Sequence, residues 1–127
     1  MTDRRLVGHL RTLALVAAGG FAGANARYGV AVVLAGLPTG LVGTLAANVA
    51  GCVLLGFLLS LEDGAVSRRA RLAVGTGFLS SFTTYSTFAV DTATSPPALA
   101  LANVGANYAL GFAGVALGRL LAREVSA

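Results

Sequence analysis

A hydroxyl-rich run covers residues 80–88, whose sequence is Ser-Ser-Phe-Thr-Thr-Tyr-Ser-Thr-Phe, inside an otherwise apolar stretch. Seven of its side chains carry a hydroxyl group, and Gly75 and Gly77, just before it, weaken a helix. Hydroxyls can satisfy backbone groups that a helix break releases, and such breaks make ion sites without charged ligands. We therefore predict an interrupted helix, with the ring edges of Tyr85 and Phe88 suited to a small anion. The alternative is a serine-rich packing face.

Other polar side chains also fall in apolar stretches, where an uncompensated polar group is costly. Asn48 follows Thr44 by one helical turn, and Asn103 and Asn107 are four residues apart. These groups either line a polar pathway or make hydrogen bonds between helices, worth about 0.6–2 kcal/mol each. Arg27 is the single cation inside an apolar stretch. It either draws anions into a water-filled vestibule or anchors the chain at the membrane surface.

Composition places these residues in a membrane protein. The 127 residues are 56% hydrophobic and 11% charged, which is more apolar side chain than a soluble domain of this size can bury. Charged residues cluster, and the tracts between clusters match the roughly 20 residues that cross a bilayer as a helix. We predict an all-α integral membrane fold, one transmembrane domain over residues 1–127, with four spans and the break in the third. The expected spans are residues 13–35, 41–61, 72–90 and 98–121.

Small residues recur four apart on these spans, as in Gly19 and Gly23 or Gly114 and Gly118. This spacing favours close packing of helix backbones in lipid. Four thin helices surround a pore poorly, so we expect a dimer.

Several function classes have little support. His9 is the single histidine and lies in the N-terminal flank, and no phosphate-binding glycine motif occurs, so an enzyme is not expected. Cys52 stands alone, which excludes a disulfide framework. The pI of about 10.2 comes from arginines beside apolar spans, which favours membrane anchoring over nucleic-acid binding. A proton-driven small multidrug exporter is an unlikely alternative because the first span lacks the membrane-embedded carboxylate that such exchange needs.

Arginine distribution predicts the orientation. With four spans, both termini and the 62–71 loop share one side of the membrane, and the opposite loops contain no Lys or Arg. Basic residues favour the cytoplasmic side, so both termini are expected there. The arginines on that side are Arg4, Arg5, Arg11, Arg68, Arg69, Arg71, Arg119 and Arg123.

Three blocks in order along the chain carry a family resemblance. They are Gly-Gly-Phe-Ala-Gly-Ala-Asn-Ala-Arg-Tyr at 19–28, Gly-Thr-Leu-Ala-Ala-Asn-Val-Ala-Gly at 43–51 and Thr-Thr-Tyr-Ser-Thr-Phe at 83–88. Together they resemble the fluoride channels of the CrcB/Fluc family. The resemblance implies a passive fluoride-selective channel that exports fluoride across the bacterial cell (inner) membrane, built as an antiparallel dimer with two pores.

The resemblance also implies roles for individual residues. Asn48 would line the pore entrance, and Tyr85 and Phe88 would hold the positions of two stacked phenylalanines, with Ser86 and Thr87 beside them. Tyr85 departs from the family pattern, because its ring carries an additional hydroxyl.

A structural sodium ion at the dimer centre is implied as well, bound by backbone carbonyls at Ser80 and Thr83. Ser80 stands where the family usually has glycine. Asn103 and Asn107 would lie near a polar track on the fourth helix.

The arginine bias conflicts with self-pairing in opposite orientations. We therefore predict a heterodimer with a related subunit of opposite orientation, with the homodimer as the alternative. The departures at Tyr85 and Ser80 leave open a structural subunit of a heteromeric fluoride channel.

Overall fold

The computed structural model describes residues 2–37, 40–62 and 64–126. These residues form helices and connecting loops, with no strand among them, so the all-α prediction is confirmed for this part of the chain. Pro38 and Thr39, which belong to the turn expected between the first two spans, lie outside the described residues.

Three helices are continuous: α1 (Thr2–Val33), α2 (Leu41–Ser60) and α6 (Pro97–Ser126). A fourth helical segment lies between α2 and α6 and consists of consecutive pieces. These are α3 (Arg68–Arg71), η1 (Leu72–Leu79), α4 (Ser80–Phe82) and α5 (Tyr85–Thr94). The η1 piece has the wide turns of a π-helix, a rare form that often marks functional sites.

Parts of the three continuous helices are long and apolar enough to cross a membrane: Leu6–Val33, Leu41–Ser60 and Pro97–Val125. The structure is therefore that of a membrane protein. The α1 helix begins before residue 13 and α6 continues past residue 121, so both extend beyond the spans expected from the sequence. A helix need not stop where the hydrocarbon stops, because its backbone hydrogen bonds also form outside the bilayer.

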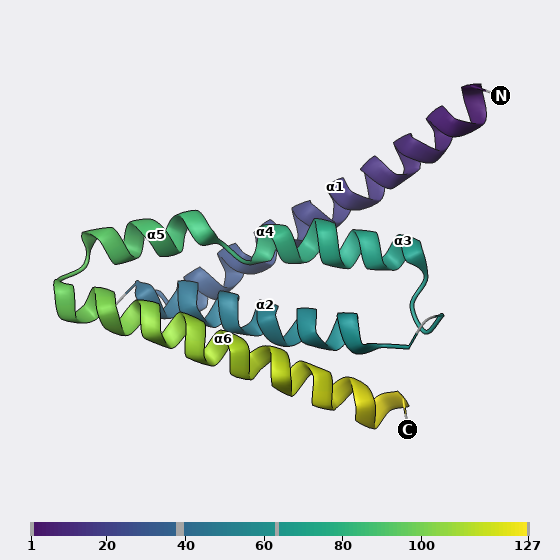
Figure 1. Ribbon diagram of the computed structural model, residues 1–127. Coiled ribbons are helices and arrows are strands. Elements are labelled where there is room, and N and C mark those ends of the chain that lie inside the picture. Colours follow the sequence, from purple (N-terminus) through teal and green to yellow (C-terminus); the bar gives the residue numbers. More distant parts are fainter. Residues whose placement is uncertain (1, 38–39, 63, 127) are drawn as a thin grey trace.

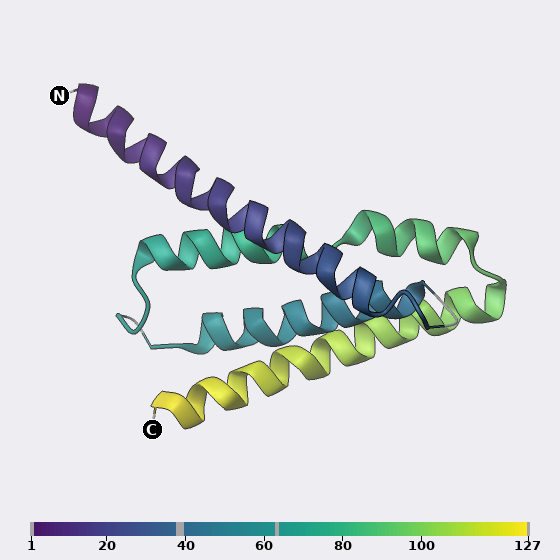
Figure 2. The ribbon, with the colours of Figure 1, turned by 180° about the vertical axis from the view of Figure 1, so that it is seen from behind.

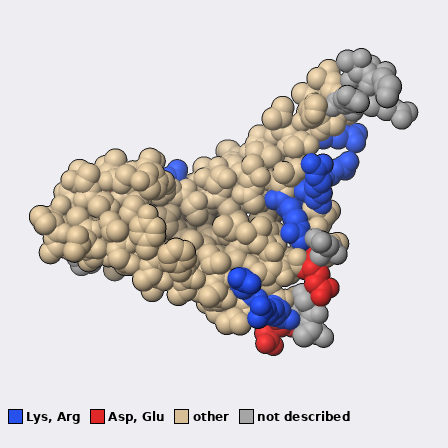
Figure 3. All heavy atoms as spheres, in the orientation of Figure 1, with Lys and Arg blue, Asp and Glu red and all other residues tan. Residues whose placement is uncertain are grey.

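The helices form two packed pairs. The α2 and α6 helices run side by side, and α1 crosses η1 and α4 while its N-terminal part leaves the bundle (Figures 1 and 2). Both termini and the α2–α3 loop lie toward one end of the molecule, where most of the visible Arg side chains also gather (Figures 1 and 3). The α5–α6 connection lies at the opposite end.

Glycine allows backbone contact within both pairs. A Cβ atom at Gly19 of α1 would collide with the carbonyl group of Ala73 in η1. A Cβ atom at Gly118 of α6 would likewise collide with the carbonyl oxygen of Val53 in α2. The predicted close packing through small residues is confirmed at these two positions, because no larger side chain fits without separating the helices.

Candidate functional site

The interrupted helical segment changes direction at two threonines. The α4 helix ends at Phe82, and Thr83 (φ −80°, ψ 159°) and Thr84 (φ −149°, ψ 121°) are extended before α5 begins at Tyr85. Both threonines belong to the hydroxyl-rich run of residues 80–88. In a continuous helix the Thr84 N–H would donate to the Ser80 carbonyl, but here it donates to a side chain of α2.

That side chain is the amide of Asn48. The Thr84 N–H donates to Asn48 Oδ1 at 2.9 Å, and Asn48 Nδ2 donates to the Thr84 carbonyl at 3.3 Å. One amide thus satisfies both backbone groups of Thr84, which is buried. Since buried backbone groups need partners, Asn48 stabilises the break directly.

A chain of hydrogen bonds continues from Asn48 into α6 and returns to α5. Asn48 Nδ2 donates to Asn107 Oδ1 at 3.1 Å, and Asn107 Nδ2 donates to Asn103 Oδ1 at 2.9 Å. Asn103 Nδ2 then donates to Thr92 Oγ1 at 2.8 Å, and the Thr92 hydroxyl donates to the Phe88 carbonyl at 2.7 Å. We call Asn48, Asn107, Asn103 and Thr92 the amide chain. It links three helices and orients each of its side chains.

The Thr84 side chain caps the first turn of α5. Its Oγ1 accepts a hydrogen bond from the Thr87 N–H at 3.2 Å and donates to Thr87 Oγ1 at 3.0 Å. The Ser86 hydroxyl lies 3.4 Å from the same oxygen. A threonine at this position satisfies a backbone donor that a helix start leaves free, which explains why α5 begins here.

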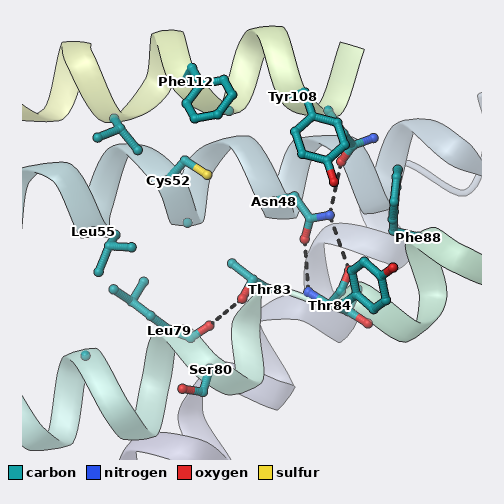
Figure 4. A pocket seen from close by; sticks show the side chains of 16 residues that line it. Asn48, Cys52, Leu55, Leu79, Ser80, Thr83, Thr84, Phe88, Tyr108 and Phe112 are labelled. Carbon is teal, nitrogen blue, oxygen red and sulfur yellow. Dashed lines mark hydrogen bonds between the residues drawn. The ribbon is translucent and has the colours of Figure 1, made fainter. Parts of the chain in front are cut away.

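A cleft of about 580 Å³ opens beside the break (Figure 4). Its polar end contains Asn48, Ser80, Thr83, Thr84 and Asn107, and its opposite end is apolar. Figure 4 shows Asn48 between Tyr108 and Thr84, and Leu55 and Leu79 along the apolar end.

Two aromatic rings stand at the polar end of this cleft. The ring centroids of Tyr85 and Phe88 are 5.9 Å apart with an interplanar angle of 47°. The Tyr85 side chain is 78% exposed, so one of these rings projects away from the subunit. Both rings belong to the first turn of α5.

The two predicted sodium ligands lie close to the break. Ser80 begins α4 and Thr83 follows its last residue, and both line the cleft. The Thr83 hydroxyl donates to the Leu79 carbonyl at 2.9 Å.

Arg27 and Thr44 belong to a second, smaller pocket of about 200 Å³ between α1, α2 and α5. Thr84 and Thr87 also line it, and Thr84 lines the larger cleft as well, so this residue is common to both pockets. The Thr44 hydroxyl donates to Asp91 Oδ2 at 2.7 Å. Asp91 therefore holds Thr44 and ties α2 to α5.

Three contributors were missed by sequence reasoning. Asp91 directly follows the expected third span, yet its carboxylate accepts from Thr44, and Thr92 completes the amide chain. Tyr108 stacks loosely with Phe112, four residues away on α6, with centroids 6.5 Å apart. The i,i+4 spacing of the two aromatic residues was a local signal for Tyr108.

Comparison with known proteins identifies the family of this chain. A family model described as CrcB-like protein, Camphor Resistance (CrcB), matches residues 14–119, which include every element from α2 to α5. The chain belongs to the CrcB family. The recognition of this family from the three sequence blocks is therefore confirmed.

Individual CrcB relatives match over most of their length. The fluoride-specific ion channel FluC 1 of Natronomonas pharaonis is 56% identical over 117 residues, covering 91% of this chain and 93% of that protein. FluC 1 of Haloarcula marismortui is 49% identical over 125 residues, covering 97% and 94%. FluC 2 of Halobacterium salinarum is 52% identical over 115 residues, covering 88% and 87%.

Proposed function

We propose that this chain is a subunit of a passive, fluoride-selective ion channel that lets fluoride leave the cell. The observation that carries the proposal is the helix break that Asn48 stabilises, with the Tyr85 and Phe88 rings beside it. The family supports a channel rather than an enzyme, and the names of relatives 49–56% identical supply the ion.

The hydrogen bonds indicate two roles for the pathway residues: some orient the site, and others contact the anion. The Nδ2 atoms of Asn48 and Asn107 each donate to two protein oxygens, so these amides orient the site rather than bind the ion. The anion would then contact hydroxyl groups and positive ring edges, which Ser86, Tyr85 and Phe88 supply. Asn103 is buried, and we assign it the same orienting role as Asn48 and Asn107.

The Arg27 pocket provides a place where anions could collect. Its guanidinium shares the pocket with Thr87, whose hydroxyl oxygen already accepts from Thr84 and can direct its own proton elsewhere. A cation next to a free hydroxyl donor attracts a small anion. We assign Arg27 and Thr87 to a vestibule of the pathway, with Thr44 held at its wall by Asp91.

An antiparallel dimer in the cell membrane is part of the proposal. Aromatic side chains beside the cleft are exposed in the single subunit: Tyr85 by 78%, Phe112 by 73% and Tyr108 by 57%. A second subunit over this face would cover the rings and close the open cleft. The arginines at one end favour cytoplasmic termini, and this bias supports a related partner of opposite orientation over self-pairing.

A sodium ion at the dimer centre fits the carbonyl groups at the break. Carbonyl groups at unwound helix ends bind sodium in transport proteins. Because the Thr84 N–H donates to Asn48, the Ser80 carbonyl does not receive the bond that a continuous helix would provide. The Ser80 and Thr83 carbonyls are our candidate ligands, and a second subunit would supply equivalent groups.

A structural subunit of a heteromeric fluoride channel is the alternative, since Tyr85 and Ser80 depart from the family pattern. Fluoride efflux from liposomes containing this chain alone, with chloride as the control ion, tests the proposal. Rapid fluoride-selective efflux supports an active, self-assembling channel. If the folded chain alone gives no efflux, and co-expression with a related chain restores it, then a partner is needed. A reporter fused to the C-terminus then measures orientation, and equal labelling on both sides would contradict the heterodimer.

A further inference from the structure

The N-terminal part of α1 diverges from the bundle (Figures 1 and 2). A pocket between this part of α1 and α3 is called the wedge here. The wedge has a volume of about 530 Å³ and is lined by Arg11, Ala14, Leu15, Arg69 and Ala70. It lies at the end of the molecule where the arginines gather (Figure 3).

Two arginines face this wedge over an uncharged floor. Arg11 comes from α1 and Arg69 from α3, and both are exposed. Among the described residues, Arg71 is the arginine whose side chain donates hydrogen bonds. Its guanidinium donates to the carbonyls of Leu61 and Glu62. Arg71 thus closes the α2–α3 loop, whereas Arg11 and Arg69 are available to an outside ligand.

The chemistry of the wedge matches a phosphate group joined to an apolar chain. Guanidinium groups bind phosphate oxygens through paired N–H donors. Next to them on α1, Leu10 is 55% exposed and Leu13 is 63% exposed, so apolar surface continues from the wedge. A free phosphate ion would leave that surface uncovered, whereas an acyl chain would cover it.

We propose that Arg11 and Arg69 bind the phosphate of an anionic membrane lipid, whose acyl chains lie against α1. Basic residues at the cytoplasmic ends of helices meet the leaflet surface, where anionic headgroups are found. The lipid would fill the space that α1 leaves as it diverges and would fix the angle of this helix.

Native mass spectrometry of the full-length protein with added phosphatidylglycerol tests the proposal. The double variant R11Q/R69Q is expected to bind this lipid about fivefold more weakly for each arginine removed, the effect of one basic group at an anionic surface. The R119Q/R123Q variant removes the same charge from exposed positions of α6 and is expected to retain wild-type binding. Equal losses in both variants would overturn the site and leave a general charge effect.

Two further arms separate the possible ligands. Excess inorganic phosphate should leave the lipid bound, and displacement by phosphate alone would overturn the lipid assignment. Phosphatidylcholine with the same acyl chains should bind more weakly than phosphatidylglycerol. A change in subunit number for R11Q/R69Q, with unchanged lipid binding, would instead identify the wedge as a contact between protein subunits.

The R11K/R69K variant guards against a folding defect, because it keeps both charges and loses the guanidinium fork. Binding between that of wild type and R11Q/R69Q is expected, with unchanged helical content by circular dichroism. Wild-type lipid binding by R11Q/R69Q overturns the proposal. None of these measurements depends on ion transport, so they are independent of the proposed channel function.

Discussion

The side-chain amide of Asn48 hydrogen-bonds to both backbone groups of Thr84, 36 residues further along the chain. The N–H of Thr84 donates to Asn48 Oδ1, and Asn48 Nδ2 donates to the Thr84 carbonyl. An extended residue between two helices has no helical partners for these groups, so α2 provides them. The break between α4 and α5 is therefore stabilised by a side chain of α2.

Replacing Asn48 with alanine should destabilise the break and lower fluoride efflux. The buried N–H and C=O of Thr84 would lose their partners, at a cost of about 1–3 kcal/mol for each unsatisfied group. Thermal unfolding in detergent and liposome efflux measure the two effects. Asn25→Ala is the control, because the exposed Asn25 amide donates to the Phe21 carbonyl of its own helix. Equal loss in both variants would contradict the role of Asn48.

Thr92→Val should weaken the site from a distance. The valine keeps the shape but removes both the acceptor for Asn103 and the donor to the Phe88 carbonyl. Asn103 is buried, so we expect a loss of about 1–2 kcal/mol of stability together with reduced efflux. Thr92→Ser should restore both.

Thr94→Val provides the matched control on the same helix. The Thr94 hydroxyl is exposed and donates to the Val90 carbonyl one turn earlier. A defect in Thr94→Val as large as that in Thr92→Val would show a general sensitivity of α5 to this change. It would contradict a specific role of the amide chain.

Gly118→Ala should separate α2 from α6. The new methyl group would meet the backbone of Val53 and lie 2.7 Å from the backbone nitrogen of Phe57, so the helices must move apart. Overpacking of this kind costs about 1–3 kcal/mol. Gly105→Ala on the same helix should be neutral or stabilising by up to about 1 kcal/mol, because nothing lies within 4 Å of its Cβ position. The midpoint of thermal unfolding distinguishes these outcomes.

Tyr85→Phe should preserve fluoride efflux, since the ring remains 5.9 Å from Phe88 and the exposed hydroxyl is the group lost. Tyr85→Ile removes the ring and should slow efflux by about tenfold, equal to about 1.4 kcal/mol in the barrier. Efflux from matched amounts of reconstituted protein checks both. Unchanged efflux in Tyr85→Ile would remove this ring from the ion pathway.

Replacement of sodium by a large organic cation during purification should lower both the thermal stability and the fluoride efflux of the protein. A ligand that binds the folded state alone adds stability that grows with the logarithm of its concentration. Titrating sodium back should therefore raise the unfolding temperature and restore efflux. A flat response to sodium would argue against an ion bound by the Ser80 and Thr83 carbonyls.

Local patterns in the sequence determined several features of this protein. Apolar tracts placed the helices, small residues four apart marked the contacts at Gly19 and Gly118, and the hydroxyl-rich run contains the extended residues Thr83 and Thr84. These features depend on neighbouring residues and on helix periodicity, which a sequence displays directly.

Tertiary structure alone decided which polar groups meet. The bonds from Asn48 to Thr84 and Asn107, and from Thr44 to Asp91, join residues 36 to 59 positions apart. Such pairs depend on the rotation and crossing of whole helices, which packing determines and local periodicity does not. The amides of Asn48, Asn103 and Asn107 hydrogen-bond to one another because the fold places them within hydrogen-bonding distance.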